Sequence, residues 1–383
     1  MIPDPASGRP FVLIDDAGGG DGGGLLFTDA IEIVVAHRRS EVASALARLG
    51  TGLAQGLQAA GYLAYEAAEA IEPRWPCRSK HAAPLLWFGL FECPIALSAA
   101  AVAGAMPPAS RATVGMPMPL IGAEWHRRAV AQTLDYIAAG DVYQVNLTFP
   151  TAVVWSGDPL ALYAGLRARG GGGHGGIVAT GERMLLSSSP ELFFTLADGI
   201  VTTRPMKGTM ARRSAPIADA AAAASLAASA KDRAENLMIT DLLRNDLSRV
   251  ASPGSVHVPA LFAIETYPTV HQMTSTVTAH LRPGLGPLDV LRAAFPCGSV
   301  TGAPKLRAAE IIAELETAPR GAYTGAIGWM RADAAHFNVA IRTLDIAGGG
   351  EARLGIGSGI VADSDAAEEW RECLAKAAFV AAT

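Results

Sequence analysis

The stretch KDRAENLMITDLLRNDLSRV, residues 231–250, carries a helical pattern from which the rest of the chain can be interpreted. Apolar residues recur in it at helical spacing and predict one buried face, made of Leu237, Ile239, Leu242, Leu243 and Leu247. Asp232 and Glu235 are three residues apart, so they share another face of the same helix. The stretch therefore predicts a helix that packs against a core and presents two carboxylates elsewhere.

The segment DSDAAEEWRECLAKAAF, residues 363–379, repeats this arrangement near the end of the chain. Ser364 or Asp365 fits the helix cap, and Glu369, Glu372 and Lys376 follow at helical spacing. If the two helices face each other, their carboxylates can hold one hard divalent cation, and Mg²⁺ suits a site built of oxygen ligands. The same spacing is typical of solvated acidic faces, so spacing alone leaves both interpretations open.

Strand-like and helical segments alternate along the rest of the chain and predict a mixed α+β protein. RMLLSSSPELFFTL and GAYTGAIGWM favour strands, while 222–248, 305–316 and 365–381 favour helices. Glycine runs at 16–24, 170–176 and 347–350 predict loops or hairpin connections. Few polar motifs precede residue 115, so we expect one domain with a supporting part (1–115) and a chemical part (120–383) interleaved by packing.

Composition narrows the class of ligand. Apolar residues make up 50% of the chain, the formal net charge is −5, and no Lys/Arg stripe points to nucleic acid or to an anionic membrane surface. MIPDPASGRP lacks the pattern of a signal peptide and no stretch is long and apolar enough to span a bilayer, so we expect a cytoplasmic protein with a small-molecule ligand. Cys77, Cys93, Cys297 and Cys373 lack CxxC spacing and predict reduced, mostly buried thiols.

Three further segments indicate an anion site. In CGSVTGAPKLRAAEII (297–312), Thr301 and Gly302 precede a helix start whose N–H groups attract a carboxylate or phosphate. GIGSGIV (355–361) lacks the third glycine of a dinucleotide fingerprint, so its glycines more simply allow the backbone to approach a ligand. Tyr323 and Arg342 lie on apolar strand-like runs, where a buried Arg needs an acid or a ligand carboxylate.

Taken together, these segments resemble the chorismate-utilising enzymes, a family that includes anthranilate, aminodeoxychorismate, isochorismate and salicylate synthases. The segments that carry the resemblance are GDVYQVNLT (140–148), SSSPELFF (187–194), KGT (207–209), residues 231–250, TYPTVHQM (266–273), PCGSVTGAPK (296–305), GAYTGAIGW (321–329), AIRT (340–343) and residues 355–377. AGYLAYEAAEAIEP (60–73) is also similar to the N-terminal part of the aminodeoxychorismate synthases. The resemblance implies the anthranilate synthase component I-like fold, in which large antiparallel sheets pack with flanking helices in a single chorismate-binding domain spanning 1–383.

The resemblance also implies a ligand set. Glu235 and Glu372 would bind Mg²⁺, with Asp232 and Glu369 in the outer shell, and the metal would hold the ring carboxylate of chorismate. Residues matched to the surroundings of the two substrate carboxylates are Thr301, Tyr323, Arg342, Gly357, Ser358, Gly359 and Lys376. His271 matches an active-site histidine of the family, and a buried, hydrogen-bonded structural histidine is the alternative.

Lys207 distinguishes branches of this family. Members that make anthranilate, isochorismate or salicylate have alanine at the matching position, whereas members that aminate C4 of the ring have lysine. If a partly desolvated, cation-containing site lowers its pKa, the amine of Lys207 can attack C2 as the C4 hydroxyl leaves. Glu191 would protonate that hydroxyl, and ammonia would enter at C4 and expel the lysine. The alternative is an exposed cation beside a turn.

Gln144 bears on the nucleophile. A lysine stands at the matching position in members that activate water, and glutamine cannot act as that base. We therefore expect ammonia as nucleophile, supplied by a separate glutamine amidotransferase subunit, with a further enzyme making 4-aminobenzoate. The rival interpretations are an anthranilate synthase component I and a non-catalytic chorismate-binding regulatory protein, which would lack the acids at 191, 235, 369 and 372.

Overall fold

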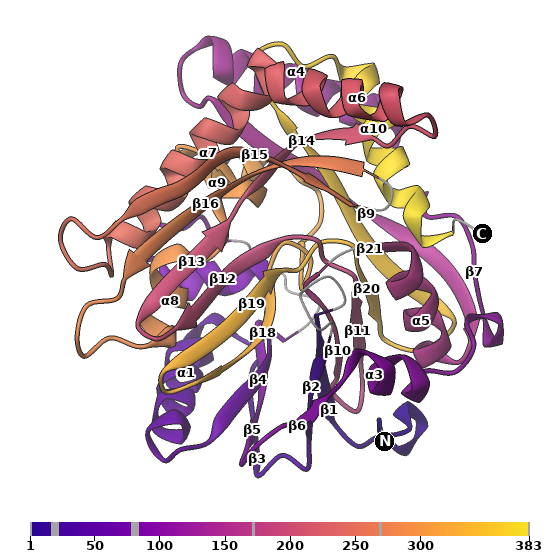
Figure 1. Cartoon of the computed structure of the whole chain (residues 1–383), viewed down its shortest axis with the longest axis vertical. Coiled ribbons are helices and arrows are strands. Elements are labelled where there is room, and N and C mark those ends of the chain that lie inside the picture. The colour runs from indigo at the N-terminus through magenta and orange to yellow at the C-terminus, as the bar shows by residue number, and fades with distance from the viewer. Residues whose placement is uncertain (1, 17–22, 78–83, 171–172, 268–269, 382–383) are drawn as a thin grey trace.

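Two large antiparallel sheets form the framework of the protein (Figure 1). The structure is a computed structural model, and it describes residues 2–16, 23–77, 84–170, 173–267 and 270–381. The first sheet runs in the order β17-β9-β21-β20-β11-β10-β1-β2-β6, with β7 and β8 also paired to β9. The second runs β14-β16-β13-β12-β19-β18-β4-β5-β3, with β15 paired to β16. The α+β class and the large antiparallel sheets expected from the sequence are confirmed.

The strands of the first sheet are β1 (Phe11–Asp15), β2 (Gly24–Thr28), β6 (Ile95–Leu97), β7 (Ala112–Val114), β8 (Met118–Pro119), β9 (Gln144–Gly157), β10 (Gly175–Ala179), β11 (Met184–Ser187), β17 (Gly302–Ala303), β20 (Thr343–Ile346) and β21 (Glu351–Ile360). Those of the second are β3 (Glu32–Ala36), β4 (Gln58–Leu63), β5 (Leu86–Phe91), β12 (Leu192–Ala197), β13 (Ile200–Arg204), β14 (Met206–Ala211), β15 (His257–Thr266), β16 (Val270–His280), β18 (Ala326–Arg331) and β19 (Ala334–Val339). The helices are α1 (Arg39–Ala54), α2 (Ala68–Ile71), α3 (Ala99–Ala105), α4 (Ala123–Ala138), α5 (Pro159–Gly170), α6 (Pro216–Ala228), α7 (Ala230–Ser248), α8 (Pro287–Ala294), α9 (Lys305–Leu315) and α10 (Ala366–Ala377).

Alternation along the strands builds three packed layers of core. In β1, Val12 and Ile14 face the second sheet, whereas Phe11 and Leu13 face the cluster that includes α5 and α10. A third cluster joins the other face of the second sheet to α1, α7 and α8. Strands from the first hundred residues form one end of each sheet, β1-β2-β6 in the first and β4-β5-β3 in the second, so the N-terminal segment is part of both sheets.

Several sequence expectations are refined by the structure. The helix expected over 222–248 is two helices, because Ser229 interrupts it and its hydroxyl accepts a hydrogen bond from the Asp232 N–H (3.2 Å) as the cap of α7. On α7, Ile239, Leu243 and Leu247 are buried, but Leu237 is 50% exposed, so its assignment to the buried face was wrong. Asp365, not Ser364, caps α10.

The irregular segments also differ in part from expectation. Tyr323 lies in the turn before β18 and Arg342 lies between β19 and β20, so neither is on a strand. The run 347–350 does connect β20 to β21, but Gly175 and Gly176 begin β10, and 17–22 and 171–172 lie outside the described residues. None of the four cysteines forms a disulfide, and only two of them, Cys297 and Cys373, are buried.

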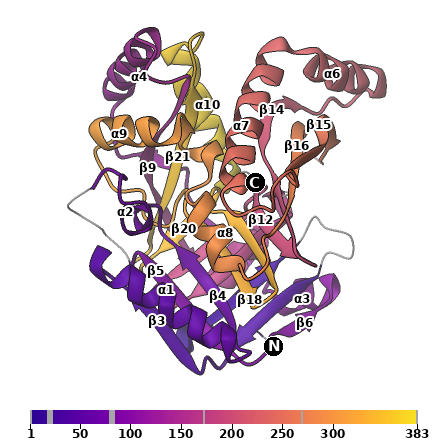
Figure 2. The same ribbon diagram turned by 90° about the vertical axis from the view of Figure 1, so that its left-hand side faces the viewer.

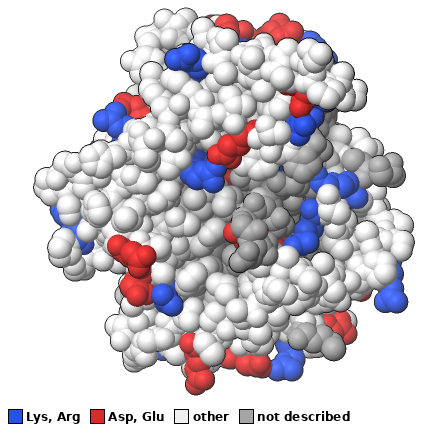
Figure 3. Space-filling view, viewed as in Figure 1, with Lys and Arg blue, Asp and Glu red and all other residues white. Residues whose placement is uncertain are grey.

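Over the described ranges, we find no helix with the length and apolar character needed to cross a bilayer. On the face drawn in Figure 3, Lys and Arg side chains lie scattered among Asp and Glu and form no stripe.

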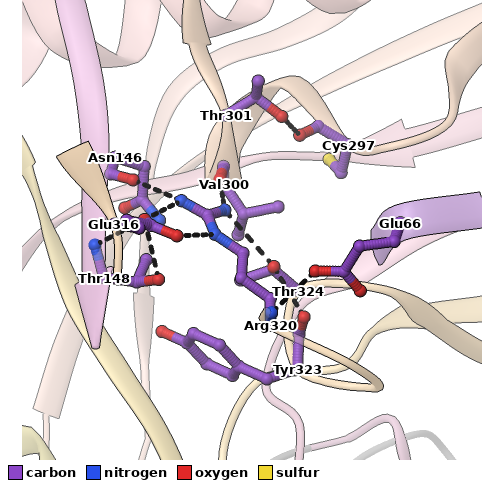
Figure 4. A network of polar contacts seen from close by, with 10 residues as sticks. All are labelled: Glu66, Asn146, Thr148, Cys297, Val300, Thr301, Glu316, Arg320, Tyr323 and Thr324. Carbon is purple, nitrogen blue, oxygen red and sulfur yellow. Dashed lines mark hydrogen bonds and ion pairs between the residues drawn. The ribbon is translucent and has the colours of Figure 1, made fainter. Parts of the chain in front are cut away.

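A buried ion pair links the elements around the centre of the protein. Arg320 and Glu316, at the end of α9, have side chains that are 1% and 2% exposed, with Nη2 of the arginine 2.6 Å from Oε1 of the glutamate. The guanidinium also donates to the backbone carbonyls of Val300 (2.8 Å) and Asn146 (2.7 Å) (Figure 4). Glu316 in turn accepts hydrogen bonds from the N–H and hydroxyl of Thr148 on β9. One pair of charges thus joins β9, the loop before β17 and the end of α9.

The N-terminal part of the chain completes this network. Glu66, which precedes α2, accepts a hydrogen bond from the N–H of Arg320 (2.7 Å) (Figure 4). It accepts another from the N–H of Gly321 (3.0 Å). The guanidinium carbon of Arg320 lies 4.4 Å from the centre of the Tyr65 ring. The segment 60–73 therefore fixes the turn that leads to Tyr323.

We expect Arg320→Met to lower the free energy of unfolding by about 3–5 kcal/mol, because it leaves Glu316 charged and buried without its partner. Urea denaturation followed by circular dichroism measures the change. Arg331→Met is the matched control, since Arg331 pairs with Asp333 at the surface and its loss should leave the midpoint nearly unchanged. Equal midpoints for Arg320→Met and the wild type would contradict the structural role of the pair.

Candidate active site

A cavity of about 540 Å³ opens between two groups of elements. Figure 2 shows α4, α9 and α10 on one side and α6 and α7 on the other. We call it the central cavity. Among the sequence-predicted site residues, those that line it are Glu191, Lys207, Asp232, Glu235, Tyr323, Arg342, Gly357, Gly359, Glu369, Glu372 and Lys376. The structure thus brings together side chains from segments that are far apart in the sequence.

Lys207 points into this cavity from β14. Its Nζ lies 2.8 Å from Oε1 of Glu235, and the two side chains are 15% and 18% exposed. Burial by itself lowers the pKa of Lys207, but the charges of Glu235, Glu191 and Glu372 together outweigh it and raise the pKa. The sequence predicted a lowered pKa for Lys207, whereas the structure raises it, because carboxylates surround the ammonium group. The alternative of a surface cation is excluded by its burial.

Glu191 is the acid best suited to proton donation. It directly precedes β12, lines the central cavity and is 5% exposed, and its Oε1 has no hydrogen-bond partner in the part of the chain that the structure describes. Burial raises the pKa of Glu191 to about 7, although a hydrogen bond from Ser299 and the charge of Lys207 oppose the shift. Glu191 can therefore hold a proton at neutral pH and release it to a leaving group.

The four predicted metal ligands lie on the two facing helices, as expected. Asp232 and Glu235 come from α7, and Glu369 and Glu372 come from α10. Each glutamate has a separate partner: Glu235 pairs with Lys207, Glu372 with Lys376 (2.6 Å), and Glu369 accepts from the Ser364 hydroxyl (2.7 Å). Within the described residues no three His, Cys, Asp or Glu side chains converge on one metal-sized point. The donors fit Mg²⁺ in kind and in location, and their side chains must turn to share one ion.

Glycines on β21 form part of the cavity wall. Gly355, Gly357 and Gly359 present the more open face of the strand, while Ser358 points to the other face and is 1% exposed. A Cβ on Gly357 would lie 2.5 Å from the carbonyl oxygen of Leu147, so only glycine fits there. The backbone can therefore come close to a ligand at this wall, whereas the Ser358 side chain cannot reach it.

Gln144 lies behind the same wall. Its amide is fully buried, and neither Nε2 nor Oε1 has a hydrogen-bond partner among the described residues. A Cβ on Gly359 would lie 2.4 Å from Nε2 of Gln144 and 3.2 Å from Oε1 of Glu235. Gln144 thus borders the central cavity without lining it, and a neutral amide occupies the corner beside Glu235.

Arg342 and Tyr323 form another part of the wall. Arg342 has a φ of 49°, in the left-handed region that non-glycine residues rarely adopt outside special sites. Burial lowers the pKa of its guanidinium, so a bound anion would stabilise the charge. The Tyr323 ring packs on Gly355, where a Cβ would lie 2.1 Å from the ring.

Besides Gln144 and Ser358, two more predicted residues lie outside the lining of the cavity. Thr301 is fully buried, and its hydroxyl donates to the carbonyl of Cys297 (3.0 Å). His271 lies on β16 with Nε2 3.0 Å from Asp219 and Nδ1 3.0 Å from the hydroxyl of Thr266. Both ring nitrogens are occupied away from the cavity, so the structure favours the structural alternative for His271.

Two residues that the sequence did not single out line the cavity instead. Gln272 follows His271 on β16, and successive residues of a strand point to opposite faces, so one of the two must face the cavity. Ser299 lies in the loop before β17 and touches Glu191. The alternation of β16 was the only signal for Gln272, and it does not reveal which of the two faces is the inner one.

Sequence and structure comparisons identify the family to which the chain belongs. The chain belongs to the chorismate binding enzyme family, whose model matches residues 27–382. Aminodeoxychorismate synthase component 1 of Klebsiella aerogenes is 46% identical over 246 residues, which are 64% of this chain and 54% of the relative. The protein of that name from Escherichia coli (strain K12) is 45% identical over 246 residues, with the same shares. The chain thus spans about half the length of these relatives.

Anthranilate synthases are similar too. Anthranilate synthase component 1 of Streptomyces coelicolor is 41% identical over 285 residues, or 74% of this chain and 55% of the relative. The crystal structure of anthranilate synthase component I from Streptococcus pneumoniae superposes with a TM-score of 0.80 at 25% identity, over 94% of this chain and 92% of that one. The anthranilate synthase component I-like fold expected from the sequence is confirmed.

We expect the pH profile of chorismate consumption to bend near pH 7, because Glu191 must be protonated to donate and its pKa is about 7. Loss of that proton above pH 7 opposes the gain in rate that deprotonation of the Lys207 amine brings. Steady-state rates measured from roughly pH 5.5 to 9 give this profile, because that range covers the pKa values of buried carboxylic acids. Glu191→Gln should remove both the activity and the inflection, whereas Glu182→Gln, at an exposed site, should keep them. A wild-type profile whose slope does not change near pH 7 would contradict the assignment.

Proposed function

We propose that the chain acts as an aminodeoxychorismate synthase component I, converting chorismate and ammonia to 4-amino-4-deoxychorismate for 4-aminobenzoate and folate synthesis. The observation that carries the proposal is the placement of a lysine and a protonatable acid, Lys207 and Glu191, in one cavity beside an acidic cluster. The names of the relatives at about 45% identity support the same activity.

In the proposed reaction the two side chains divide the chemistry. The amine of Lys207 attacks C2, both ring double bonds shift, and the C4 hydroxyl leaves as water with the proton of Glu191. Ammonia then attacks C4, the two double bonds shift back, and the C2–N bond to Lys207 breaks. The Glu191 carboxylate takes back a proton from the new ammonium group. Attack requires the neutral amine. Lys207 must therefore separate from Glu235 and lose its proton before it attacks.

The acids on α7 and α10 would hold Mg²⁺. Glu235 and Glu372 would bind the ion directly, and Asp232 and Glu369 would support them, since all four offer oxygen ligands at one cavity. A bound Mg²⁺ supplies positive charge that attracts the ring carboxylate of the substrate. Opening of the ion pair between Lys207 and Glu235 would free the Glu235 carboxylate to bind the metal and would free the Lys207 amine to attack the substrate.

The remaining residues would bind and orient chorismate. Arg342, Lys376 and the amides of Gly357 and Gly359 offer positive charge and N–H donors to its two carboxylates. Tyr323 would orient the ring, while Thr301 and Ser358 would act from behind the wall through their backbones. Gln144, a neutral amide, provides no base for water, so ammonia is the nucleophile we propose.

A partner subunit would supply that ammonia. The words "component 1" in the names of the relatives support the existence of a second component, for which we propose a glutamine amidotransferase. The cytoplasm, expected from the sequence, stays a prediction. So does the absence of nucleic acid and membrane partners.

The second candidate is anthranilate synthase component I, which the 41% identical relative from Streptomyces coelicolor favours. It would leave Lys207 without a catalytic task. A regulatory chorismate-binding protein is less well supported, since Glu191, Glu235, Glu369 and Glu372 are all present and gathered at one cavity.

Identification of the product separates these candidates. With chorismate, ammonium and Mg²⁺, we expect mass spectrometry to find 4-amino-4-deoxychorismate, which keeps the enolpyruvyl group. Glutamine should replace ammonium only after an amidotransferase subunit is added. Anthranilate and pyruvate as products would overturn the proposal in favour of the second candidate, and unconsumed chorismate would favour the regulatory protein.

For the metal, we expect Glu235→Ala and Glu372→Ala to abolish turnover and Mg²⁺ binding without unfolding the protein, because each removes a ligand. Titration calorimetry with Mg²⁺ and thermal denaturation measure the two effects. Glu368→Ala is the control, since Glu368 is exposed on the same helix as Glu372. Full activity of the chelator-treated enzyme would contradict the metal assignment.

For the nucleophile, we expect Lys207→Ala to slow formation of 4-amino-4-deoxychorismate by orders of magnitude while chorismate still binds, because the proposed carboxylate contacts lie elsewhere. Intact mass of the wild type incubated with chorismate and no ammonia should show an adduct of chorismate less water, absent from Lys207→Ala. Lys231→Ala, at a half-exposed residue paired with Asp363, should still form it. Undiminished turnover in Lys207→Ala would show that the lysine is a bystander.

A further inference from the structure

Lys207 lies in a β-bulge. Between β14 and β16, Met206 pairs with Thr274 and Thr209 pairs with Gln272. Three steps along β14 therefore match two along β16, so Lys207 and Gly208 together oppose the single residue Met273. Bulges redirect a side chain next to active sites, and here the extra residue sets the direction in which Lys207 leaves the strand.

The bulge itself depends on a glycine. Gly208 has a φ of +87°, in the left-handed region, and a Cβ added to it would lie 2.8 Å from Cβ of Asp232 on α7. The close approach of α7 thus leaves no room for another residue at 208. It also sets β14 directly against the helix that carries Glu235, the partner of Lys207.

The side chain of Gln272 closes the bulge on the opposite side. Its Nε2 donates to the carbonyl of Gly208 (2.8 Å), and its Oε1 accepts from the hydroxyl of Thr209 (2.8 Å). Both ends of the amide are used, on two residues that directly follow Lys207. Gln272 is 9% exposed, so water competes little for these bonds.

The strand that carries Gln272 is in turn anchored from behind. His271 points to the other face of β16 and bonds to Asp219 on α6, which also accepts from Nε of Arg212 and from the N–H of Arg213. These two arginines lie just beyond β14. The His271–Asp219 contact therefore holds β16 and the chain after the bulge together, and it leaves Gln272 fixed at the inner face.

We propose that Gln272 is a positioning residue for Lys207, which pins the bulge so that the amine of Lys207 points at the reacting ring. The inference rests on the proposed function for the role of Lys207, but not for the bulge or its hydrogen bonds. Gln272 touches the backbone of Gly208 and the side chain of Thr209, and acts on the substrate only through the lysine.

The test compares Gln272→Ala with the wild type by two independent measurements. Hydrogen–deuterium exchange should accelerate in the peptide covering 204–211 and stay unchanged in one covering 276–280. The kcat should fall by about 10- to 100-fold, since a misplacement near 1 Å costs about that much, with the KM for chorismate changed little. Thr209→Val, which removes one of the two bonds, should show a smaller effect in the same direction.

A double-mutant cycle separates positioning from general damage. In the Lys207→Ala background, Gln272→Ala should reduce the residual rate no further, because it acts through the missing amine. Thr276→Ala is the matched control, since it lies on the same face of β16 four residues away, and it should leave exchange and kcat unchanged.

Each outcome is decisive. Unchanged hydrogen–deuterium exchange at 204–211 in Gln272→Ala would show that Gln272 does not hold the bulge, whatever the activity, and would overturn the proposal. Faster exchange with an unchanged kcat would show that Gln272 holds the bulge but that the position of Lys207 does not affect catalysis. That result would overturn the positioning role and count against the proposed function. Equal losses in the wild-type and Lys207→Ala backgrounds would show that Gln272 acts by another route and would overturn the positioning role.

Discussion

The buried pair of Arg320 and Glu316 is the interaction on which the centre of this protein depends. It ties the carbonyls of Asn146 and Val300 to the end of α9 and, through Glu66, to the N-terminal segment. Asn146, Val300 and Tyr323 all line the central cavity, so the pair fixes one wall from behind. Two opposite charges can stay buried here because nearly every donor and acceptor around them is satisfied, which offsets much of their desolvation.

The two walls of the cavity are built by different means. On one side, β21 uses glycines at alternate positions, which lets a ligand approach the backbone and leaves Gln144 just behind it. On the other side, β14 presents one long side chain, Lys207, from an irregular point in its ladder. A smooth, donor-rich wall suits carboxylate binding, whereas a single projecting amine suits attack on one ring carbon. In the proposed reaction, the residues that bind the substrate are therefore separated in space from the residue that attacks it.

The acidic cluster gives the cavity its electrostatic character. Burial raises the pKa of Glu191 to about 7, whereas the charge of Lys376 outweighs burial and lowers the pKa of Glu372. Glu235 is ion-paired with Lys207. Carboxylates in one cavity thus take different protonation states, as a site needs when one acid donates a proton and others hold cations. Lys207 interacts with all three, so its state is coupled to theirs.

The sequence by itself determined the helices that carry Asp232, Glu235, Glu369 and Glu372, because helical spacing places such residues on one face. It also supplied Lys207 and Glu191 as candidates through the resemblance, and the antiparallel α+β architecture followed in the same way. Only the tertiary structure decided which strand residues face the cavity. On β16, His271 points away from the cavity and Gln272 points in; on β21, Ser358 points away and Gly357 and Gly359 face the cavity. Adjacent residues of a strand face opposite ways, and the sheets and helices that pack on a strand decide which of its two faces is the inner one. The bulge at Lys207 is of the same kind: it exists only through pairing with β16 and contact with α7, which are distant in the sequence.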